Sequence, residues 1–320
     1  EQESARQANN LNKNTFYKVA KSYIAENQSS WRSNVTKKQW PNSLRDYVYP
    51  IIGSKPVHLI TIHDVLSVLR PIWSEKTTTA TRVRSRIENI LDYATTLEMR
   101  QGNNPAIWRG NLSKVLPAPK KVHKIKSHPA VSYTELHGFL MELRKRKGVG
   151  ARALEFTILT GSRTRPLLLA KWEDIDFDNA IWNCPEDNMK SGNFFRIPLS
   201  EPAMSIIYSQ KKYSRGEYIF GHEQTGKKSS NNCMLYTIYR MGYRGKVTTH
   251  GMRSTMRDWA GETTKYSERI VEVCLDHTVN TANQAAYQRG DYLVKRREIM
   301  DGWGRFCYPS ENKVIHISRR

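Results

Sequence analysis

Hydrophobic side chains recur every three or four positions along the first third of the chain, and this spacing predicts an all-helical unit. The first predicted helix begins after Thr15, the second covers about 35–47, and the third follows Thr61, which can cap it. Residues 49–57, which contain Pro and Gly, interrupt the pattern between the second and the third helix. Residues 1–14 are polar and lack the spacing, so we expect a disordered or linking lead-in there.

The fourth predicted helix has the clearest apolar stripe and runs from Thr79 to about Leu97. Its stripe consists of Ala80, Val83, Ile87, Ile90, Leu91, Ala94 and Leu97. Three arginines of the same segment, Arg82, Arg84 and Arg86, fall mostly off that stripe. We therefore expect them on the side of the helix that faces away from the core.

A stretch without a core pattern separates this unit from the rest of the chain. Residues 116–130 read LPAPKKVHKIKSHPA, and this density of Pro and Lys is typical of an extended, basic linker. Beyond it, helices are predicted at about 133–147 and 149–160, and Ser132 can cap the first of them.

Short alternating segments follow and predict a small antiparallel sheet. The strand candidates are 175–182, 194–198, 218–220 and 313–318. From Met234 onward the helical spacing returns, and the apolar residues of its last part are expected in the core. These are Leu293, Ile299, Met300 and Trp303.

The pattern as a whole predicts a mainly α-helical fold with a small antiparallel sheet. We expect a helical domain at 15–118, a linker at 119–130, and a mixed α and β domain at 131–320. The last residues of that domain, 305–320, lie beyond the last convincing helix and form a tail.

The charge of the chain narrows the choice of partner. Lys and Arg number 51 against 30 Asp and Glu, which gives a formal net charge of +21. Such an excess favours a polyanion, and nucleic acid is the commonest polyanionic partner of a large protein. A membrane surface is the alternative, but the sequence has neither a long apolar run nor a basic cluster beside one.

This charge balance also bears on two groups of cations. The arginines of the fourth helix, Arg82, Arg84 and Arg86, form either a solvated basic face or a DNA contact, and both interpretations stay open. An extended linker can follow a duplex, so its lysines are candidates for contacts with phosphates. They are Lys120, Lys121, Lys124 and Lys126.

The cysteines are widely spaced and form no CxxC pair. They are Cys184, Cys233, Cys274 and Cys307, and we expect reduced thiols in a cytosolic protein. Cys274 and His277 would make half of a zinc site, but no second ligand pair accompanies them, so we expect no metal. The chain begins with Glu1 and has no signal peptide, so we expect that it was processed or begins inside a longer protein.

Candidate chemistry is concentrated in residues 248–289, which contain TTHGMRSTMRDWA, CLDH and AAYQRGDY. His250, Arg253, His277 and Tyr287 follow one another in this stretch. Cations and a phenol in this order suit a reaction in which a tyrosine attacks a phosphodiester while basic groups hold its oxygens. The sequence therefore indicates DNA breakage and rejoining.

The physical chemistry of phosphodiesters supports this hypothesis. The transition state gathers negative charge on the nonbridging oxygens, where rigid bidentate arginines act best. His250 and Arg253 are three residues apart and share a helix face, and Thr248 or Thr249 can cap that helix with its positive end near the phosphate. Since a tyrosine has an ordinary pKa near ~10, a base must assist its ionisation, and His250 is our candidate.

Each of these side chains also has an ordinary structural interpretation. A histidine is more often a hydrogen-bonded surface or core group than a catalyst, and the chain has nine. Tyr287 is one of sixteen tyrosines, which commonly serve as amphipathic anchors. Its place after LDH and inside AAYQR distinguishes it from Tyr292, which we expect at the start of the next helix.

Five segments in order resemble the tyrosine recombinases, closest to the integrases of P4-like prophages and genomic islands. They are LTGSRTRPLLLAKWEDID (159–176), MKSGNFFRIPLS (189–200), THGMRSTMRDWA (249–260), LDHTVN (275–280) and AAYQRGDYLVKRREIM (285–300). In the first half YVYPIIG, LRPIW, TATRVRSRIENILDYA and NNPAIWRGNL resemble the core-binding domain of that family. The resemblance begins near Thr15, and five motifs in the right order are specific where any single one is weak.

The resemblance implies a division of labour around the scissile phosphate. It implies that Arg163 and Arg253 hold the phosphate and that Lys190, on the turn between two strands, is the general acid for the leaving 5′ hydroxyl. His250 and His277 would complete the pocket. Tyr287 would attack and leave a 3′-phosphotyrosyl link, which a second 5′ hydroxyl reverses without water, metal, ATP or another cofactor.

The resemblance also implies an assembly. Such an enzyme clamps double-stranded DNA at attachment sites as a homotetramer and integrates or excises a mobile element, with an excisionase and a DNA-bending host factor as further partners. The tail at 305–320 is our candidate for exchange between neighbouring subunits. The expected location is the cytoplasm of a bacterium, at the nucleoid. Family members usually carry an N-terminal arm-binding domain, and its absence before residue 15 leads us to expect a truncated chain.

One position departs from the family pattern and keeps two alternatives open. The third residue after the first arginine is usually acidic in the family, and here it is Pro166. The acid supports the pocket, so its absence leaves Arg163 less firmly oriented. The alternatives are a type IB topoisomerase, which shares the chemistry, and a DNA-binding protein with impaired catalysis.

Overall fold

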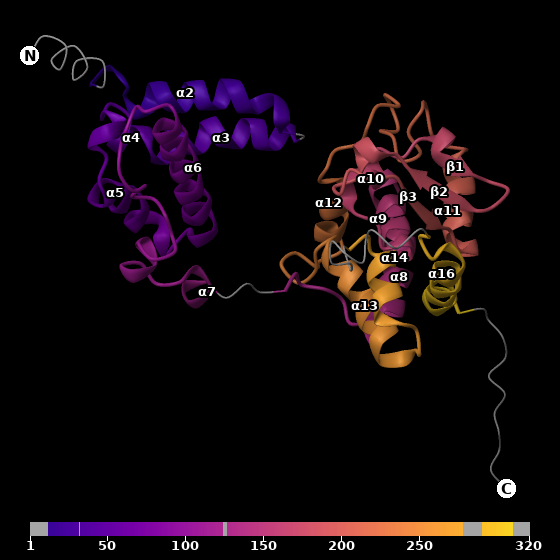
Figure 1. The fold of residues 1–320 in the computed structure, drawn as a ribbon. Helices are drawn as coiled ribbons and strands as arrows, with labels where there is room; N and C mark the ends of the chain where they lie inside the picture. The colour runs from indigo at the N-terminus through magenta and orange to yellow at the C-terminus, as the bar shows by residue number, and fades with distance from the viewer. Residues whose placement is uncertain (1–11, 32, 124–126, 278–289, 310–320) are drawn as a thin grey trace, which may run out of the picture. The chain divides into compact units, whose positions relative to one another are not determined.

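The computed structural model describes residues 12–31, 33–123, 127–277 and 290–309 (Figure 1). It divides into two compact units between Lys126 and Ser127. We describe each unit by itself. In the described parts, no helix is both long and apolar enough to span a membrane.

The N-terminal unit is helical throughout its described part. Its helices are α2 (Phe16–Asn27), α3 (Asn34–Tyr47), α4 (Tyr49–Ile52), α5 (Ile62–Trp73), α6 (Thr77–Thr96) and α7 (Pro119–Val122). The four helices predicted from the apolar spacing are confirmed as α2, α3, α5 and α6. The short helix α4 lies where the pattern is interrupted, and its Pro50 is tolerated because the first turn needs no amide donor there.

Helix α5 shows how a local signal fixes the start of a helix. The side chain of Thr61 accepts a hydrogen bond from the backbone N–H of Asp64, and the Asp64 carboxylate accepts one from the backbone N–H of Thr61 at 2.7 Å. Lys55 also pairs with this carboxylate at 2.8 Å. The predicted cap at Thr61 is therefore confirmed as a complete capping box.

Helix α6 supplies the centre of the core of this unit and packs against α2, α3 and α5. Six of its seven predicted stripe residues are fully buried, but Leu97 is 47% exposed. The prediction for Leu97 is wrong because the helix ends at Thr96, and Leu97 is the cap residue that leaves the helical path.

The prediction that Arg86 lies off the buried stripe is also wrong. Arg86 is only 8% exposed, and its guanidinium donates to the backbone oxygen of Gln39 at 3.0 Å and to the Ser43 hydroxyl. It also lies over the Trp40 ring, 5.3 Å from the ring centroid. Arg86 therefore ties α6 to α3, and this role replaces its interpretation as a DNA contact.

The other two arginines of α6 differ from Arg86. Arg84 pairs with Glu88 at 2.6 Å and donates to the backbone oxygen of Ala106 at 2.8 Å, so part of its hydrogen-bonding capacity serves the fold. Arg82 is exposed, as predicted. Of the three, Arg82 stays an open candidate for a DNA contact.

The different surroundings of these arginines predict different effects on stability. Arg86→Ala should lower the free energy of unfolding of the N-terminal unit by roughly 2–3 kcal/mol, because it leaves buried acceptors of α3 without their donor. Arg82→Ala, on the same helix, should change it by less than about 0.5 kcal/mol. Urea unfolding followed by tryptophan fluorescence measures both, and equal effects would contradict the structural role of Arg86.

The beginning of the predicted linker is not extended. The indole N–H of Trp73 donates to the Pro117 oxygen at 2.9 Å, and Val122 of α7 packs against the core of the N-terminal unit. Lys120 and Lys121 are exposed on α7. The sequence lacked a core pattern there because the contacts come from a few residues of a short helix. Lys124 and Lys126 lie outside the described residues.

The C-terminal unit combines helices with a three-stranded sheet. Its elements are α8 (Leu136–Arg144), α9 (Val149–Thr160), α10 (Thr164–Leu168), β1 (Ile175–Asp176), β2 (Ile181–Cys184), β3 (Phe195–Pro198), α11 (Glu201–Gln210), α12 (Cys233–Arg240), α13 (Gly251–Thr263), α14 (Glu268–Cys274) and α16 (Leu293–Cys307). The strands are antiparallel in the order β1-β2-β3, with Trp182 opposite Ile197. The predicted fold class, mainly α with a small antiparallel sheet, is confirmed.

Three of the predicted strands have other outcomes. Residues 175–182 are not one strand, because a turn separates β1 from the start of β2 within them. Residues 218–220 form only a single bridge, between Tyr218 and Lys171, so no strand exists there. Residues 313–318 lie outside the described part of the chain. The tail at 305–320 is described only to residue 309, and helix α16 continues into it as far as Cys307.

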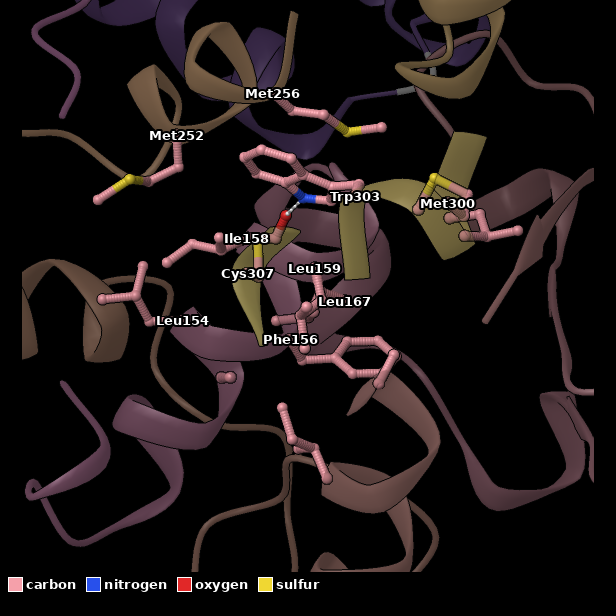
Figure 2. Close-up of a cluster of buried hydrophobic side chains, with 14 of the residues drawn as sticks. Leu154, Phe156, Ile158, Leu159, Leu167, Met252, Met256, Met300, Trp303 and Cys307 are labelled. Carbon is pink, nitrogen blue, oxygen red and sulfur yellow. Dashed lines mark hydrogen bonds between the residues drawn. The ribbon is translucent and has the colours of Figure 1, made fainter. Parts of the chain in front are cut away.

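Trp303 of α16 is the centre of the core that joins α9, α13 and α16 (Figure 2). Its side chain is fully buried, and its indole N–H donates to the Ile158 oxygen of α9 at 2.7 Å. Met256 of α13 lies on the side of the Trp303 ring opposite to Ile158. Because this core fixes the three helices against one another, it also fixes the end of α9 and the start of α13, where candidate site residues lie. Trp303, Ile299 and Met300 are buried as predicted, whereas Leu293 is only partly buried.

Candidate active site

Three chain segments meet where α9 ends, α13 begins and α14 ends. After α9 the chain turns at Gly161, whose φ is 60°, and a Cβ there would lie 2.8 Å from Leu275. Only glycine allows this close approach. Arg163 follows as the residue that precedes α10, Arg253 lies in the first turn of α13, and Leu275 follows α14.

Arg253 is the most buried cation of the site, with 3% exposure. Its guanidinium donates to the backbone oxygen of Gly161 at 2.7 Å and to that of Leu275, and its Nη2 lies 3.0 Å from His277 Nε2. Burial, with repulsion from Arg163, lowers the Arg253 pKa to about 10, so the group remains charged near neutral pH. Its Nε–H is buried and has no hydrogen-bond partner in the described part of the chain.

Arg163 lies beside Arg253 and is held by one residue. Its Nη1 pairs with the carboxylate of Asp276, and its Nη2 donates to the Asp276 backbone oxygen at 2.8 Å. The side chain keeps 23% exposure, and burial lowers its pKa. A guanidinium has five N–H donors, so three of those on Arg163 have no acceptor in the described part of the chain.

His277 is oriented from both sides of its ring. Nδ1 contacts the Glu272 carboxylate, and Nε2 faces Arg253. Since an arginine can only donate, Nε2 accepts, and the proton of the neutral ring is on Nδ1, where Glu272 accepts it. Glu272 is itself 2.5 Å from the Arg257 Nε. This chain of contacts fixes His277 against the buried arginine.

His250 immediately precedes α13 and is an exposed residue whose imidazole is partly covered by its neighbours. The N-cap residue of α13 is His250 itself, and not Thr248 or Thr249 as predicted. The Thr248 hydroxyl nevertheless accepts from the backbone N–H of Gly251, the first residue of α13, at 2.9 Å. The His250 ring contacts that of His128 edge to face, with 4.6 Å between centroids. Partial burial, followed by repulsion from Arg253 and His128, lowers the His250 pKa, so the ring is neutral near pH 7 and can accept a proton.

The lowered pKa of His250 predicts a titration below the ordinary value of 6.5. Because the folded pKa is below the unfolded one, stability from this group is fully present above about pH 6.5 and is lost as the pH falls through the folded pKa. A histidine NMR titration, with His250→Gln to assign the signal, measures the midpoint. A midpoint at or above 6.5 would contradict the positive surroundings described here.

Lys190 lies on the connection between β2 and β3, as the sequence predicts. It is exposed, and within the described ranges it makes no hydrogen bond or ion pair. Its neighbour Met189 lines a small cavity together with Arg163, Arg253 and Asp276. The hairpin therefore reaches the site, while the structure describes no contact between the Lys190 amine and the arginines.

Tyr287 lies outside the described residues, which resume at Gly290. Asp291, which follows Gly290, pairs with Arg196 of β3 at 3.0 Å. Tyr292 then adopts a left-handed conformation with φ 56° and precedes α16, as predicted from the sequence. The pair between Asp291 and Arg196 joins the start of this described part to the sheet.

Sequence reasoning missed three side chains at this site. Asp276, Glu272 and His128 each contact a predicted site residue. Asp276 lies inside the LDH motif, so its place in the sequence could have identified it as a site residue. Nothing in the sequence around Glu272 or His128 indicated a place in the site. Cys274 and His277 do not face each other as metal ligands would, since Cys274 is buried and His277 pairs with Glu272. The described residues hold no cluster of three metal-binding side chains.

Comparison with known families gives matches in both units. Residues 16–111 match the phage integrase central domain, and residues 135–291 match the phage integrase family. The prophage integrase IntZ of Escherichia coli K12 is 28% identical over 90% of this chain and 70% of its own length. The integrase of Enterobacteria phage P4 is 28% identical over 97% of this chain and 73% of its own length.

Solved structures share the fold. A lambda integrase tetramer bound to a Holliday junction matches with a TM-score of 0.70 and 16% identity, over 88% of this chain and 83% of its own. A lambda integrase (75–356) dimer bound to a core site matches with a TM-score of 0.67 and 17% identity, over 83% of this chain and 96% of its own. The integrase of transposon Tn1549, in complex with circular-intermediate DNA, matches with a TM-score of 0.66 and 15% identity, over 89% of this chain and 99% of its own.

Proposed function

This chain belongs to the phage integrase family and is a site-specific tyrosine recombinase of P4-like type, and from that premise we propose how its residues cut and rejoin DNA. The observation that supports the proposal most strongly is the meeting of Arg163, Arg253 and His277 at the junction of three segments. Two adjacent arginines suit a phosphate, since fixed donors can reach its nonbridging oxygens.

In the proposed cleavage step the Tyr287 oxygen attacks the scissile phosphorus. A bond forms between this oxygen and phosphorus while the bond from phosphorus to the 5′ oxygen breaks. His250 takes the phenol proton, and Lys190 gives a proton to the leaving 5′ oxygen. The product is a 3′-phosphotyrosyl link with a free 5′ hydroxyl.

The remaining groups act on the charge of the phosphate. Arg163, with its free donors, and Arg253, with its unpartnered Nε–H, donate to the nonbridging oxygens. His277 presents Arg253 to the phosphate, because Glu272 holds the ring. In the joining step a 5′ hydroxyl from another strand attacks the phosphotyrosyl link, and the protons move in the reverse direction.

We further propose that the two units together clamp double-stranded DNA at attachment sites and that four copies assemble for strand exchange. The lambda integrase structures hold DNA as dimers and as a tetramer on a Holliday junction, which supports a DNA partner and a multimer. Exposed Arg82, Lys120 and Lys121 are candidates for contacts with the DNA backbone. An excisionase and a DNA-bending host protein complete the proposed assembly, which would act at the nucleoid of a bacterial cell.

The experiment that tests this function uses a nicked duplex library with a randomised core. Denaturation with SDS after incubation retains DNA that is covalently bound, and sequencing it identifies the preferred site. A plasmid with two copies of that site should then yield a deletion circle. Relaxation of the plasmid without deletion would instead indicate a topoisomerase, and binding without covalent retention would indicate a protein that has lost catalysis.

A further inference from the structure

Asp276 has no role in the chemistry above, yet it contacts a proposed phosphate-binding arginine at two points. Its carboxylate pairs with Nη1 of Arg163, and its backbone oxygen accepts from Nη2 at 2.8 Å. The Asp276 side chain is only 15% exposed, so water competes little for this pair. One residue therefore holds both terminal nitrogens of the guanidinium.

Pro166 is positioned near this pair but cannot serve it. It lies three residues after Arg163, is buried in α10, and lines the same small cavity as Arg163 and Asp276. A proline has neither a side-chain charge nor a backbone N–H. The carboxylate that fixes Arg163 therefore comes from the segment after α14, which is 113 residues away in sequence.

The backbone at Asp276 is left-handed, with a φ of 51°, because this residue follows the C-cap of α14. The backbone N–H of His277 donates to the Glu272 oxygen and that of Asp276 donates to the Val273 oxygen, both at 3.0 Å, which is the pattern of a Schellman cap. Aspartate tolerates this conformation better than most residues. The end of α14 therefore places the carboxylate and the backbone oxygen of Asp276 against Arg163.

We infer that Asp276 is a positioning residue for Arg163 in the cleavage step, and this inference rests on the phosphate-binding role proposed for Arg163. Asp276 accepts one hydrogen bond from each of the two terminal nitrogens of Arg163. The other three N–H donors of the guanidinium can then bind the nonbridging oxygens. A negative charge beside the phosphate opposes binding, so the benefit lies in orientation. The carboxylate should therefore affect the rate of cleavage more than the affinity for DNA.

Two substitutions test this inference without disturbing the backbone. Asp276→Asn keeps the shape and tolerates the left-handed conformation, and Asp276→Gly removes the side chain at a position where glycine is unstrained. Both should stay folded, and thermal unfolding is measured beside the rate, because each variant weakens or removes the partner of a partly buried arginine. In single-turnover cleavage of a nicked duplex that carries the selected site, both should be roughly 10–100-fold slower, as for other groups that orient a primary ligand. Their Kd for DNA should stay within about threefold of the parent value.

A second substitution asks whether a carboxylate can act from the other segment. Adding Pro166→Glu to the Asp276→Gly variant should raise its cleavage rate by about tenfold or more. In the parent the same substitution should raise the rate by less than about twofold, since the two carboxylates would serve one arginine. If Pro166→Glu changed the cleavage rate by the same factor in Asp276→Gly and in the parent, the inference would be overturned, because positions 166 and 276 would then act independently. Cleavage by Asp276→Asn as fast as the parent, or faster, would also overturn it, and a faster rate would mean that the carboxylate competes with the phosphate.

The design separates this inference from the proposed function. Arg163→Ala should abolish cleavage in every background. If the parent cleaves and Arg163→Ala does not, while Asp276→Asn equals the parent, only the positioning role of Asp276 fails. If the parent itself forms no adduct, or Arg163→Ala cleaves normally, the proposed function of the site fails.

Discussion

Replacement of Tyr287 by phenylalanine should abolish the covalent protein–DNA adduct and leave the affinity for DNA within about twofold of the parent value. Phenylalanine keeps the ring and removes only the oxygen that we propose attacks phosphorus. The arginines proposed to hold the phosphate come from other segments, so we expect that binding does not need the phenol. None of the described residues that line the small cavity beside Arg163 and Arg253 is another tyrosine, and for this reason the expected loss is complete.

The measurement is a denaturing gel on a nicked duplex that carries a label at the 5′ end of the cut strand. The short 5′-hydroxyl piece diffuses away, so the parent accumulates as a labelled adduct. Tyr292→Phe is the matched control, because Tyr292 precedes α16 and packs against the core, and this variant should form the adduct. An adduct that persists in Tyr287→Phe would show that another residue attacks.

Arg253→Lys should slow single-turnover cleavage by roughly 10²–10³-fold, the effect of removing one preorganised donor from a developing oxyanion. Lysine keeps the charge but cannot reproduce the fork that reaches Gly161, Leu275 and the phosphate together. The loss should appear in the rate at saturating DNA, because a buried donor acts mainly on the transition state.

A folding control is necessary for this variant, since the carbonyl oxygens of Gly161 and Leu275 lose their donor. Thermal unfolding and DNA affinity should be measured beside the rate. Arg244→Lys is a suitable matched variant, because Arg244 is exposed in the same unit, and it should cleave at the parent rate at saturating DNA. Unchanged cleavage by a folded Arg253→Lys would remove Arg253 from the chemistry.

The helices were predictable because their signal is local. The apolar stripe of α6 and the Thr61 cap of α5 are both written in neighbouring residues. Arg86 was misplaced because its partners, Gln39 and Ser43, are 47 and 43 residues away and become neighbours only in the fold. The local sequence does not distinguish a basic side chain that is buried between two helices from one that is exposed to solvent.

The site divides in the same way. The types and order of Arg163, His250, Arg253 and His277 were visible in the motifs, and the fold brings these residues together from separate segments. The motifs did not predict how these side chains are oriented, because their orientation depends on contacts with carboxylates. Asp276 was present in a motif without an assigned role, since its partner lies 113 residues upstream. The sequence suggested a loosely held Arg163 from Pro166 alone, and the structure provides a different acid for it.

The proposed recombination depends on a covalent bond between Tyr287 and a 3′ phosphate of DNA. Mass spectrometry of the adduct, after proteolysis and nuclease trimming, identifies both the modified residue and the end of the DNA to which it is joined. We expect one modified peptide, with the nucleotide attached through its 3′ phosphate to Tyr287. A nucleotide on any other residue, a link through a 5′ phosphate, or the absence of an adduct with Tyr287 intact would contradict it.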